Sequence, residues 1–197
     1  ADPSSLLGRR LNAALFPTTC YGKNSGGEPL EIPQLTWAQL RAFHQSYYHP
    51  SNSWIFTYGN LPLEEHLQQI DHLALSRFTK QPVESSIPRQ ERFAEPARIT
   101  QTFPIDVNED MQQRSMIQLA WLTCPIEDTL ERAATGILAN LLLGNPAAPL
   151  YRALIESGLG RNLSPGTGYH DDYRDTYIAA GLQGTDPDKL PEIEKGI

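Results

Sequence analysis

The five histidines are the side chains of this sequence best suited to metal or acid–base chemistry. Glu65-His66 resembles the end of the inverted zinc motif His-x-x-Glu-His, but Pro62 stands where the first histidine belongs. His66 and His72 are six residues apart, whereas two histidines reach one metal from a helix face when they are four apart. We therefore expect no metal site on this stretch and interpret it as a solvated helix surface. The remaining histidines are His44, His49 and His170.

Each remaining histidine also has a structural interpretation. His44 is expected to be a half-buried packing residue, and His49, just before a proline, a hydrogen-bonding loop residue. His170 adjoins Asp171 and Asp172, so a weak metal cluster stays possible there, with a solvated turn as the favoured alternative.

The sequence contains no complete motif for nucleophilic catalysis or for phosphate binding. Cys20 and Cys124 form no Cys-x-x-Cys pair and have no histidine partner in sequence, so we expect two buried thiols. Residues 25–27 lack the Gly-Lys-Ser/Thr ending of a phosphate loop. Residues 158–168 are glycine-rich but lie between an expected helix and strand, the reverse of a dinucleotide fingerprint, and are interpreted as a turn region. We therefore predict that this chain contains no catalytic and no metal-ligating residues.

The amino-acid composition argues against some classes of binding partner. The 197 residues carry a net charge of −7, which argues against nucleic acid or an anionic membrane as a partner. Apolar runs are far shorter than the roughly 20 residues that a membrane helix needs. With 40% hydrophobic residues, the chain can bury a core of one domain or a little more.

The first half of the chain is expected to contain two helices and one strand. Thr36-x-x-Gln39 predicts a capping box that begins a helix ending near Tyr47. The β-branched and aromatic run at 53–59 predicts a buried strand, and Asn60 a cap for a helix ending near residue 78. Residues 79–110 are dotted with prolines and predict a linker, in which 97–103 could form a strand.

The second half predicts alternating strands and helices. Strands are expected at 116–123 and 176–184, and helices after Asp128, at 149–157 closed by Gly158, and after Asp186. The chain stops just after that last helix begins, so we expect a fragment of a longer protein. The fold class is α/β (α+β), with helices packed on a mostly antiparallel sheet.

Ordered motifs across the chain resemble the presequence-protease branch of the pitrilysin/insulinase family of zinc metallopeptidases. The second block resembles that family's second-domain signature, a Pro-Leu start to a helix that ends in a Gly-Leu turn. The matching stretches are Tyr21-Gly22, Asn24-Ser25-Gly26-Gly27, Ile32-Pro33-x-Leu35-Thr36, Phe43-His44, Tyr47-Tyr48-His49-Pro50-Ser51-Asn52, Tyr58-Gly59-Asn60 and residues 149–160.

The resemblance implies a place within a larger enzyme that degrades unfolded peptides in a closed chamber. Residues 1–78 would end its first, catalytic domain, 79–110 would be a linker, and 111–197 would open its second domain, so both domains would be incomplete. The zinc ligands and the general base would lie upstream of residue 1, so this chain alone is expected to be inactive and free of zinc.

Some functional alternatives stay open. Asn24, Ser25, Gly26 and Gly27 either help to shape the substrate chamber or form a plain surface loop. The expected partners are peptide substrates and the remainder of the same polypeptide, in a bacterial cytoplasm or an organelle lumen. The alternative function is a non-catalytic paralogue that acts as a scaffold or assembly subunit.

Overall fold

The computed structural model describes residues 2–197, which fold into two compact units. One unit contains the chain up to Ser25 together with Ile87–Ile197, and the other contains Gly26–Ser86. None of the helices in the described residues is both long and apolar enough to cross a membrane.

The first unit is built on an antiparallel sheet in which β4 (Asp175–Thr185) is central. β1 (Ser115–Pro125) pairs with one side of β4, and the short strands β2 (Asn162–Leu163) and β3 (Gly168–His170) pair with the other. Ala120 lies opposite Ala179 and Ile117 opposite Leu182, so the two long strands are in register over most of their length. The mixed class with an antiparallel sheet is confirmed.

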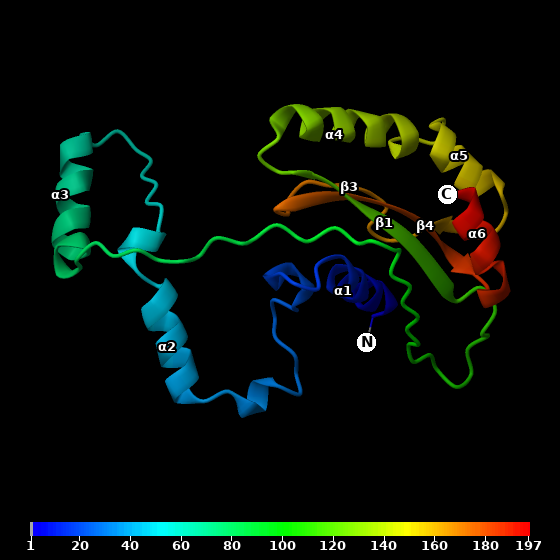
Figure 1. The fold of residues 1–197 in the computed structure, drawn as a ribbon, viewed down its shortest axis with the longest axis horizontal. Coiled ribbons are helices and arrows are strands. Elements are labelled where there is room, and N and C mark those ends of the chain that lie inside the picture. The colour runs from blue at the N-terminus through cyan, green and yellow to red at the C-terminus, as the bar shows by residue number, and fades with distance from the viewer. Residues whose placement is uncertain (1) are drawn as a thin grey trace. The chain divides into compact units, whose positions relative to one another are not determined.

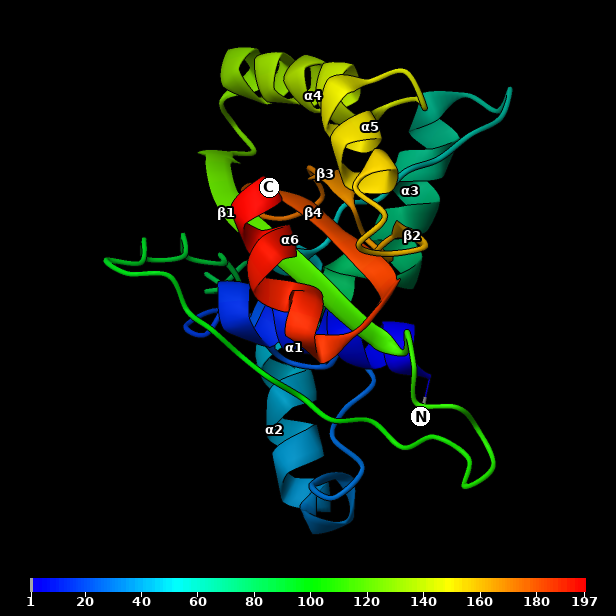
Figure 2. The ribbon, with the colours of Figure 1, turned by 90° about the vertical axis from the view of Figure 1, so that its right-hand side faces the viewer.

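Helices cover both faces of this sheet. α1 (Pro3–Leu15) lies on one face, where Leu15 and Phe16 pack against Tyr177 and Ala179 (Figure 1). Three helices lie on the opposite side, with Leu154, Leu182 and Ile193 as their buried contacts (Figure 2). These helices are α4 (Thr129–Leu143), α5 (Pro149–Glu156) and α6 (Leu190–Gly196).

Local sequence signals account for the ends of these helices. Asp128 accepts a hydrogen bond from the Glu131 N–H at 3.1 Å, as its capping position predicts. Gly158 follows α5 with φ of +69°, a backbone conformation that favours glycine. Asp186 precedes a 3-10 helix (Pro187–Lys189) that leads into α6, but its side chain accepts the Gln113 N–H instead of capping a helix.

Two expectations for this unit are wrong. Residues 158–168 are not only turns, because β2 and the start of β3 lie there and pair with β4. Residues 97–103 form no strand, because that segment makes no ladder with the sheet of this unit. The sequence analysis did not predict α1, although Asp2 caps it by accepting the Ser5 N–H at 2.7 Å and Pro3 is its first residue.

The second unit contains α2 (Trp37–Tyr47) and α3 (Leu63–Leu73) and several 3-10 turns. The predicted capping box is present, because Thr36 Oγ1 accepts the Gln39 N–H and Gln39 Oε1 accepts the Thr36 N–H. Pro62, and not Asn60, is the N-cap of α3, which ends at Leu73 before a 3-10 turn.

The predicted buried strand at 53–59 is also wrong in this structure. These residues form neither helix nor strand, and all of them are exposed. Strand propensity alone does not form a sheet, since each strand needs a hydrogen-bonded neighbour.

Candidate functional site

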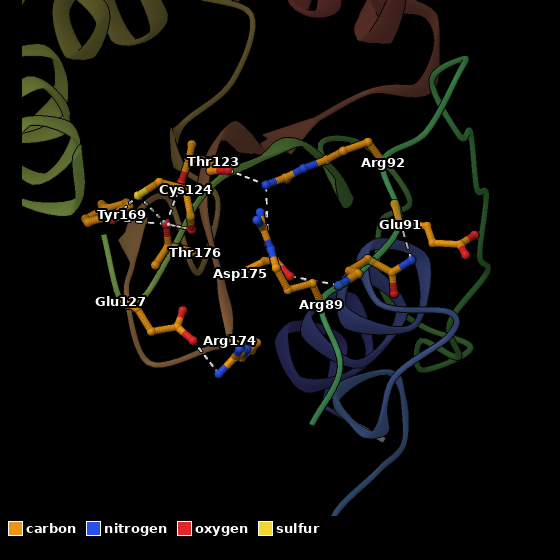
Figure 3. Close-up of polar contacts among 11 residues, drawn as sticks. Arg89, Glu91, Arg92, Thr123, Cys124, Glu127, Tyr169, Arg174, Asp175 and Thr176 are labelled. Carbon is orange, nitrogen blue, oxygen red and sulfur yellow. Dashed lines mark hydrogen bonds and ion pairs between the residues drawn. The ribbon is translucent and has the colours of Figure 1, made fainter. Parts of the chain in front are cut away.

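Asp175, the first residue of β4, is a buried polar side chain of the first unit that accepts four hydrogen bonds. Its side chain is 1% exposed, and both oxygens accept hydrogen bonds from the proline-dotted segment (Figure 3). Arg89 donates to Oδ1 from Nε at 3.1 Å and from a terminal nitrogen at 2.9 Å. The Gln90 N–H donates to Oδ2 at 2.8 Å, and Arg92 donates to Oδ1 at 3.3 Å.

We call Arg89, Gln90, Arg92 and Asp175 the Asp175 clamp. Burying a carboxylate is costly unless charged donors replace the lost water, and two guanidinium groups and one backbone N–H do so here. Three of the four hydrogen bonds go to Oδ1 and one goes to Oδ2, so both oxygens of the carboxylate have donors. Asp175 is therefore placed to hold a segment of chain, and not to take a proton from a substrate.

The clamp also joins two other parts of the unit. Arg92 donates a second hydrogen bond to the Thr123 carbonyl of β1. The Gln90 side chain is buried, and its Oε1 accepts from the N–H and the hydroxyl of Thr18, just after α1. One short stretch of chain thus connects the end of α1, the end of β1 and the start of β4.

A further ion pair continues this attachment along the chain. Arg98 donates to both carboxylate oxygens of Glu194 on α6, at 2.6 and 2.5 Å. The paired guanidinium lowers the pKa of the Glu194 carboxyl, and the same pair raises the pKa of Arg98. We call residues 87–98 the strap, because three of its arginines pair with carboxylates of the first unit.

A second polar cluster lies beside the clamp and is shown in the same view (Figure 3). Thr176 donates to the Cys124 carbonyl at 2.9 Å and accepts from the Tyr169 hydroxyl at 3.1 Å. Burial raises the pKa of the Tyr169 hydroxyl, which the hydrogen bond to Thr176 partly offsets. The Cys124 thiol lies 3.4 Å from the Thr176 hydroxyl. Hydroxyls and a thiol without a base cannot form an activated nucleophile, so this cluster is structural.

The histidines take separate local roles. His49 Nδ1 accepts the Ser51 N–H at 3.1 Å, which confirms its expected place in a loop. His44 is exposed and stacks on Tyr48, so its half-buried placement was wrong. His170 lies in β3, where it donates from Nε2 to the Gly166 carbonyl and stacks on Tyr177. The solvated-turn interpretation of His170 therefore gives way to a strand residue.

Metal-ligating side chains are scattered over the molecule. Across residues 2–197, no three side chains of His, Cys, Asp or Glu come together in a group that could hold a metal ion. Cys124 is buried as expected, but Cys20 is exposed.

The predicted chamber-shaping loop of Asn24, Ser25, Gly26 and Gly27 forms a turn. Gly27 has φ of +83°, and a Cβ there would come within 3.0 Å of the Ile32 side chain. The boundary between the two units falls inside this loop, between Ser25 and Gly26. Its role toward a substrate stays a prediction.

Sequence reasoning missed the Asp175 clamp. A charged residue directly before the apolar run of β4, together with Arg-x-x-Arg in the preceding linker, was the available signal. The spacing of more than 80 residues between these two features hid their pairing.

Comparisons with known proteins place this chain in context. The profile of the peptidase M16 inactive domain matches residues 34–197. A mitochondrial presequence protease of Xenopus laevis is 40% identical over 98% of this chain. A chloroplastic/mitochondrial presequence protease 1 of Arabidopsis thaliana is 34% identical over 100% of this chain. Protein HypA of Clostridium perfringens is 38% identical over 83% of this chain. The chain spans 17–19% of the length of these relatives.

Proposed function

The chain belongs to the peptidase M16 family, and from that membership we propose that it is a non-catalytic stretch of a presequence-protease-like zinc metalloendopeptidase. The observation that carries the proposal is the 40% identity to a presequence protease over 98% of this chain. The complete enzyme would degrade unfolded peptides in a closed chamber, and this stretch would contribute chamber wall and a domain junction.

The domain boundaries are part of the same proposal. Residues 1–78 would complete the first domain, 79–110 would connect the domains, and 111–197 would open the second. The profile that matches 34–197 describes an inactive domain, which supports a structural role for the second part.

The zinc ion belongs elsewhere in the proposed enzyme. The described residues do not fit a zinc site, because no three metal-ligating side chains converge and the histidines act in separate hydrogen bonds and ring stacks. We place the ligands and the general base upstream of residue 1, and no catalytic step is assigned to this chain.

The strap supplies the physical basis for a domain junction. The two guanidinium groups on a buried carboxylate and the Arg98–Glu194 pair fix residues 89–98 on the first unit. A peptidase chamber needs its walls held in one arrangement, because a misplacement of about 1 Å can cost roughly a hundredfold in rate.

Partners and compartment follow from the relatives. We propose peptides as substrates and the remainder of the same polypeptide as the main partner. Relatives named for mitochondria and chloroplasts, and one from a bacterium, support an organelle lumen or a bacterial cytoplasm.

A non-catalytic paralogue is the second candidate, which the inactive-domain profile also fits. An intact His-x-x-Glu-His and a later glutamate upstream of residue 1 would favour the enzyme. Their absence would favour a scaffold or assembly subunit.

The first experiment compares the longer polypeptide with the 197-residue chain. We expect the longer polypeptide to cleave an unfolded fluorogenic peptide and to lose that activity with a chelator. The 197-residue chain should cleave nothing and bind no stoichiometric zinc. Zinc-dependent turnover by the short chain, or an inactive and zinc-free longer polypeptide, contradicts the proposal.

A further inference from the structure

An open cavity of about 670 Å³ lies in the first unit, at the end of the sheet where β1 begins (Figure 2). Its walls are the start of α1, residues 103–106, and the adjoining ends of β1, β2 and β4. None of the residues of the Asp175 clamp lines it. Sites for small ligands commonly have volumes of about 300–1,000 Å³, so this cavity has room for one.

Three side chains that line the cavity form a row across three strands. Met116 of β1 lies opposite Gln183 of β4, and Gln183 also lies opposite Asn162 of β2, so the three side chains share one face of the sheet. Within residues 2–197, the carboxamides of Asn162 and Gln183 make no side-chain hydrogen bond. Their donors and acceptors are therefore available to a bound molecule.

Arg161 is a cation of this cavity that has no carboxylate partner among the described residues. Its Nε donates to Gln113 Oε1 at 2.6 Å, and its two terminal nitrogens make no hydrogen bond in the same part of the chain. By contrast, Arg114 in the lining is paired with Glu109 at 3.5 Å. Asp106 also lines the cavity but is exposed, so water and salt screen its repulsion of an anion. The unpaired guanidinium group matches the two oxygens of a carboxylate.

The orientation of Arg161 is fixed by the chain around it. A Cβ at Gly184 would lie 2.8 Å from the Arg161 Cβ and 2.9 Å from its Cγ, so the arginine stem rests directly on the glycine backbone. Gln113 has φ of +55°, a conformation that is uncommon for residues with a side chain, and its N–H donates to Asp186. Backbone strain of this kind is concentrated at ligand sites. The guanidinium group is therefore positioned before a ligand binds.

We propose that this cavity binds the C-terminal end of a peptide. Arg161 holds the terminal carboxylate, and the carboxamides of Asn162 and Gln183 pair with the adjacent peptide group, because a carboxamide both donates and accepts. Met116 and Phe103 supply apolar surface for the last side chain of the peptide. A simple inorganic anion would use Arg161 and leave both carboxamides unpaired. The inference rests on the proposed function only in taking a longer polypeptide as the protein to be tested.

Two short probes that differ only in their end group test this. N-acetyl-dialanine has a free carboxylate, and its C-terminal amide does not. Isothermal titration of the longer polypeptide, with a chelator present to prevent zinc-dependent turnover, should show at least about tenfold tighter binding of the carboxylate probe. Equal binding of the two probes, or no binding of either, overturns the proposal. Inorganic phosphate that binds as tightly as the carboxylate probe assigns a simple anion site and also overturns it.

Variants of the longer polypeptide assign the binding to this cavity. Arg161→Gln should abolish the preference for the carboxylate probe, and Arg161→Lys, which keeps the charge, should retain part of it. Arg152→Gln is the matched control, because it removes an arginine of a surface pair with Glu156 outside the cavity, and it should bind both probes like the wild type. An unchanged preference in Arg161→Gln overturns the assignment, and the two wild-type titrations decide the matter if that variant does not fold.

A further variant tests Gln113 as a positioning residue. Asparagine also adopts the left-handed backbone conformation, but its shorter side chain does not reach the Arg161 Nε. Gln113→Asn should therefore weaken the preference for the carboxylate probe without changing the binding of the amide probe. Equal weakening of both probes would show that Gln113 acts only on the structure of the cavity.

Turnover of an unfolded peptide, measured on the same proteins without chelator, keeps this inference apart from the proposed function. Carboxylate-selective binding by a protein that cleaves nothing leaves the site and removes the peptidase. Cleavage by a protein that does not distinguish the probes leaves the peptidase and removes the site.

Discussion

A buried carboxylate is stable only when donors replace the water that it loses, and Asp175 depends on donors from a segment more than 80 residues earlier in the chain. Arg89 and Arg92 are themselves about half exposed, so part of their charge remains solvated. The clamp therefore contributes to stability mainly by supplying hydrogen-bond donors to the buried Asp175 carboxylate.

Removing the charge of Asp175 tests this. We expect Asp175→Asn to lower the free energy of unfolding by about 2 kcal/mol, because it weakens hydrogen bonds from charged donors. Urea unfolding followed by circular dichroism measures the change. Glu156→Gln removes the partner of Arg152 in a surface pair and should cause no measurable change. Equal effects of the two substitutions would contradict a special role for the clamp.

Tyr177 makes a pH-dependent contribution. Burial, and then the neighbouring Tyr173, raise the pKa of its hydroxyl above the usual value of 10.0. The neutral phenol is therefore stabilised in the folded state. Its contribution is complete below the unfolded pKa and is lost as the pH rises toward the folded pKa.

We expect the stability of the wild-type chain to fall as the pH rises above about 10, and Tyr177→Phe to flatten that fall. Urea midpoints measured through the alkaline range give the slope. Tyr58→Phe, at a ring that is 94% exposed, is the control and should keep the wild-type slope. An unchanged slope in Tyr177→Phe would assign the alkaline loss to other groups.

Element by element, three local capping signals were correct, whereas the Asn60 cap and the pairing of distant segments were not predicted correctly. The Thr36 capping box, the Asp128 cap and the Gly158 terminus lie where the sequence predicts them, because each depends on neighbours three or four residues away. The strand at 53–59 failed because a strand needs a partner. The Asp175 clamp was missed because the local sequence around Asp175 contains none of its partners.

The close pairing of β1 and β4 depends on Gly181. A Cβ at this position would lie 2.0 Å from the Ile117 carbonyl oxygen and 2.8 Å from the Ser164 hydroxyl. We expect Gly181→Ala to destabilise the chain by about 1–3 kcal/mol, because the strands must separate.

The control for Gly181→Ala is Gly136→Ala, in α4. Its Cβ would lie 3.5 Å from the Tyr169 ring, an ordinary contact. Because alanine favours a helix over glycine, this change should be neutral or stabilising by up to about 1 kcal/mol. Thermal unfolding of both variants gives the comparison, and similar losses in the two would contradict the packing argument.

At the scale of the whole chain, the 79–110 linker contains segments of two kinds. Its part from 89 to 98 is fastened to the first unit by arginine–carboxylate pairs, whereas no such pair holds Lys80 among the described residues. Limited trypsin digestion should therefore cut after Lys80 before it cuts after Arg89 or Arg92.

The Asp175→Asn variant should lose this order, with early cleavage after Arg89 and Arg92 that mass spectrometry can assign. Cleavage after Arg77, outside the strap, serves as an internal reference and should not change. Early cleavage at Arg89 in the wild-type chain would show that the strap is not held.

The position of α1 has a consequence for synthesis. Asn12 hydrogen-bonds Tyr173, which follows 161 residues later, and Leu15 and Phe16 are buried in a cluster with side chains of β1 and β4. At about 5–20 residues per second, a ribosome needs on the order of ten seconds to make that interval. The apolar side of α1 lacks these partners for that time, so a newly made chain exposes it until the central strand β4 emerges.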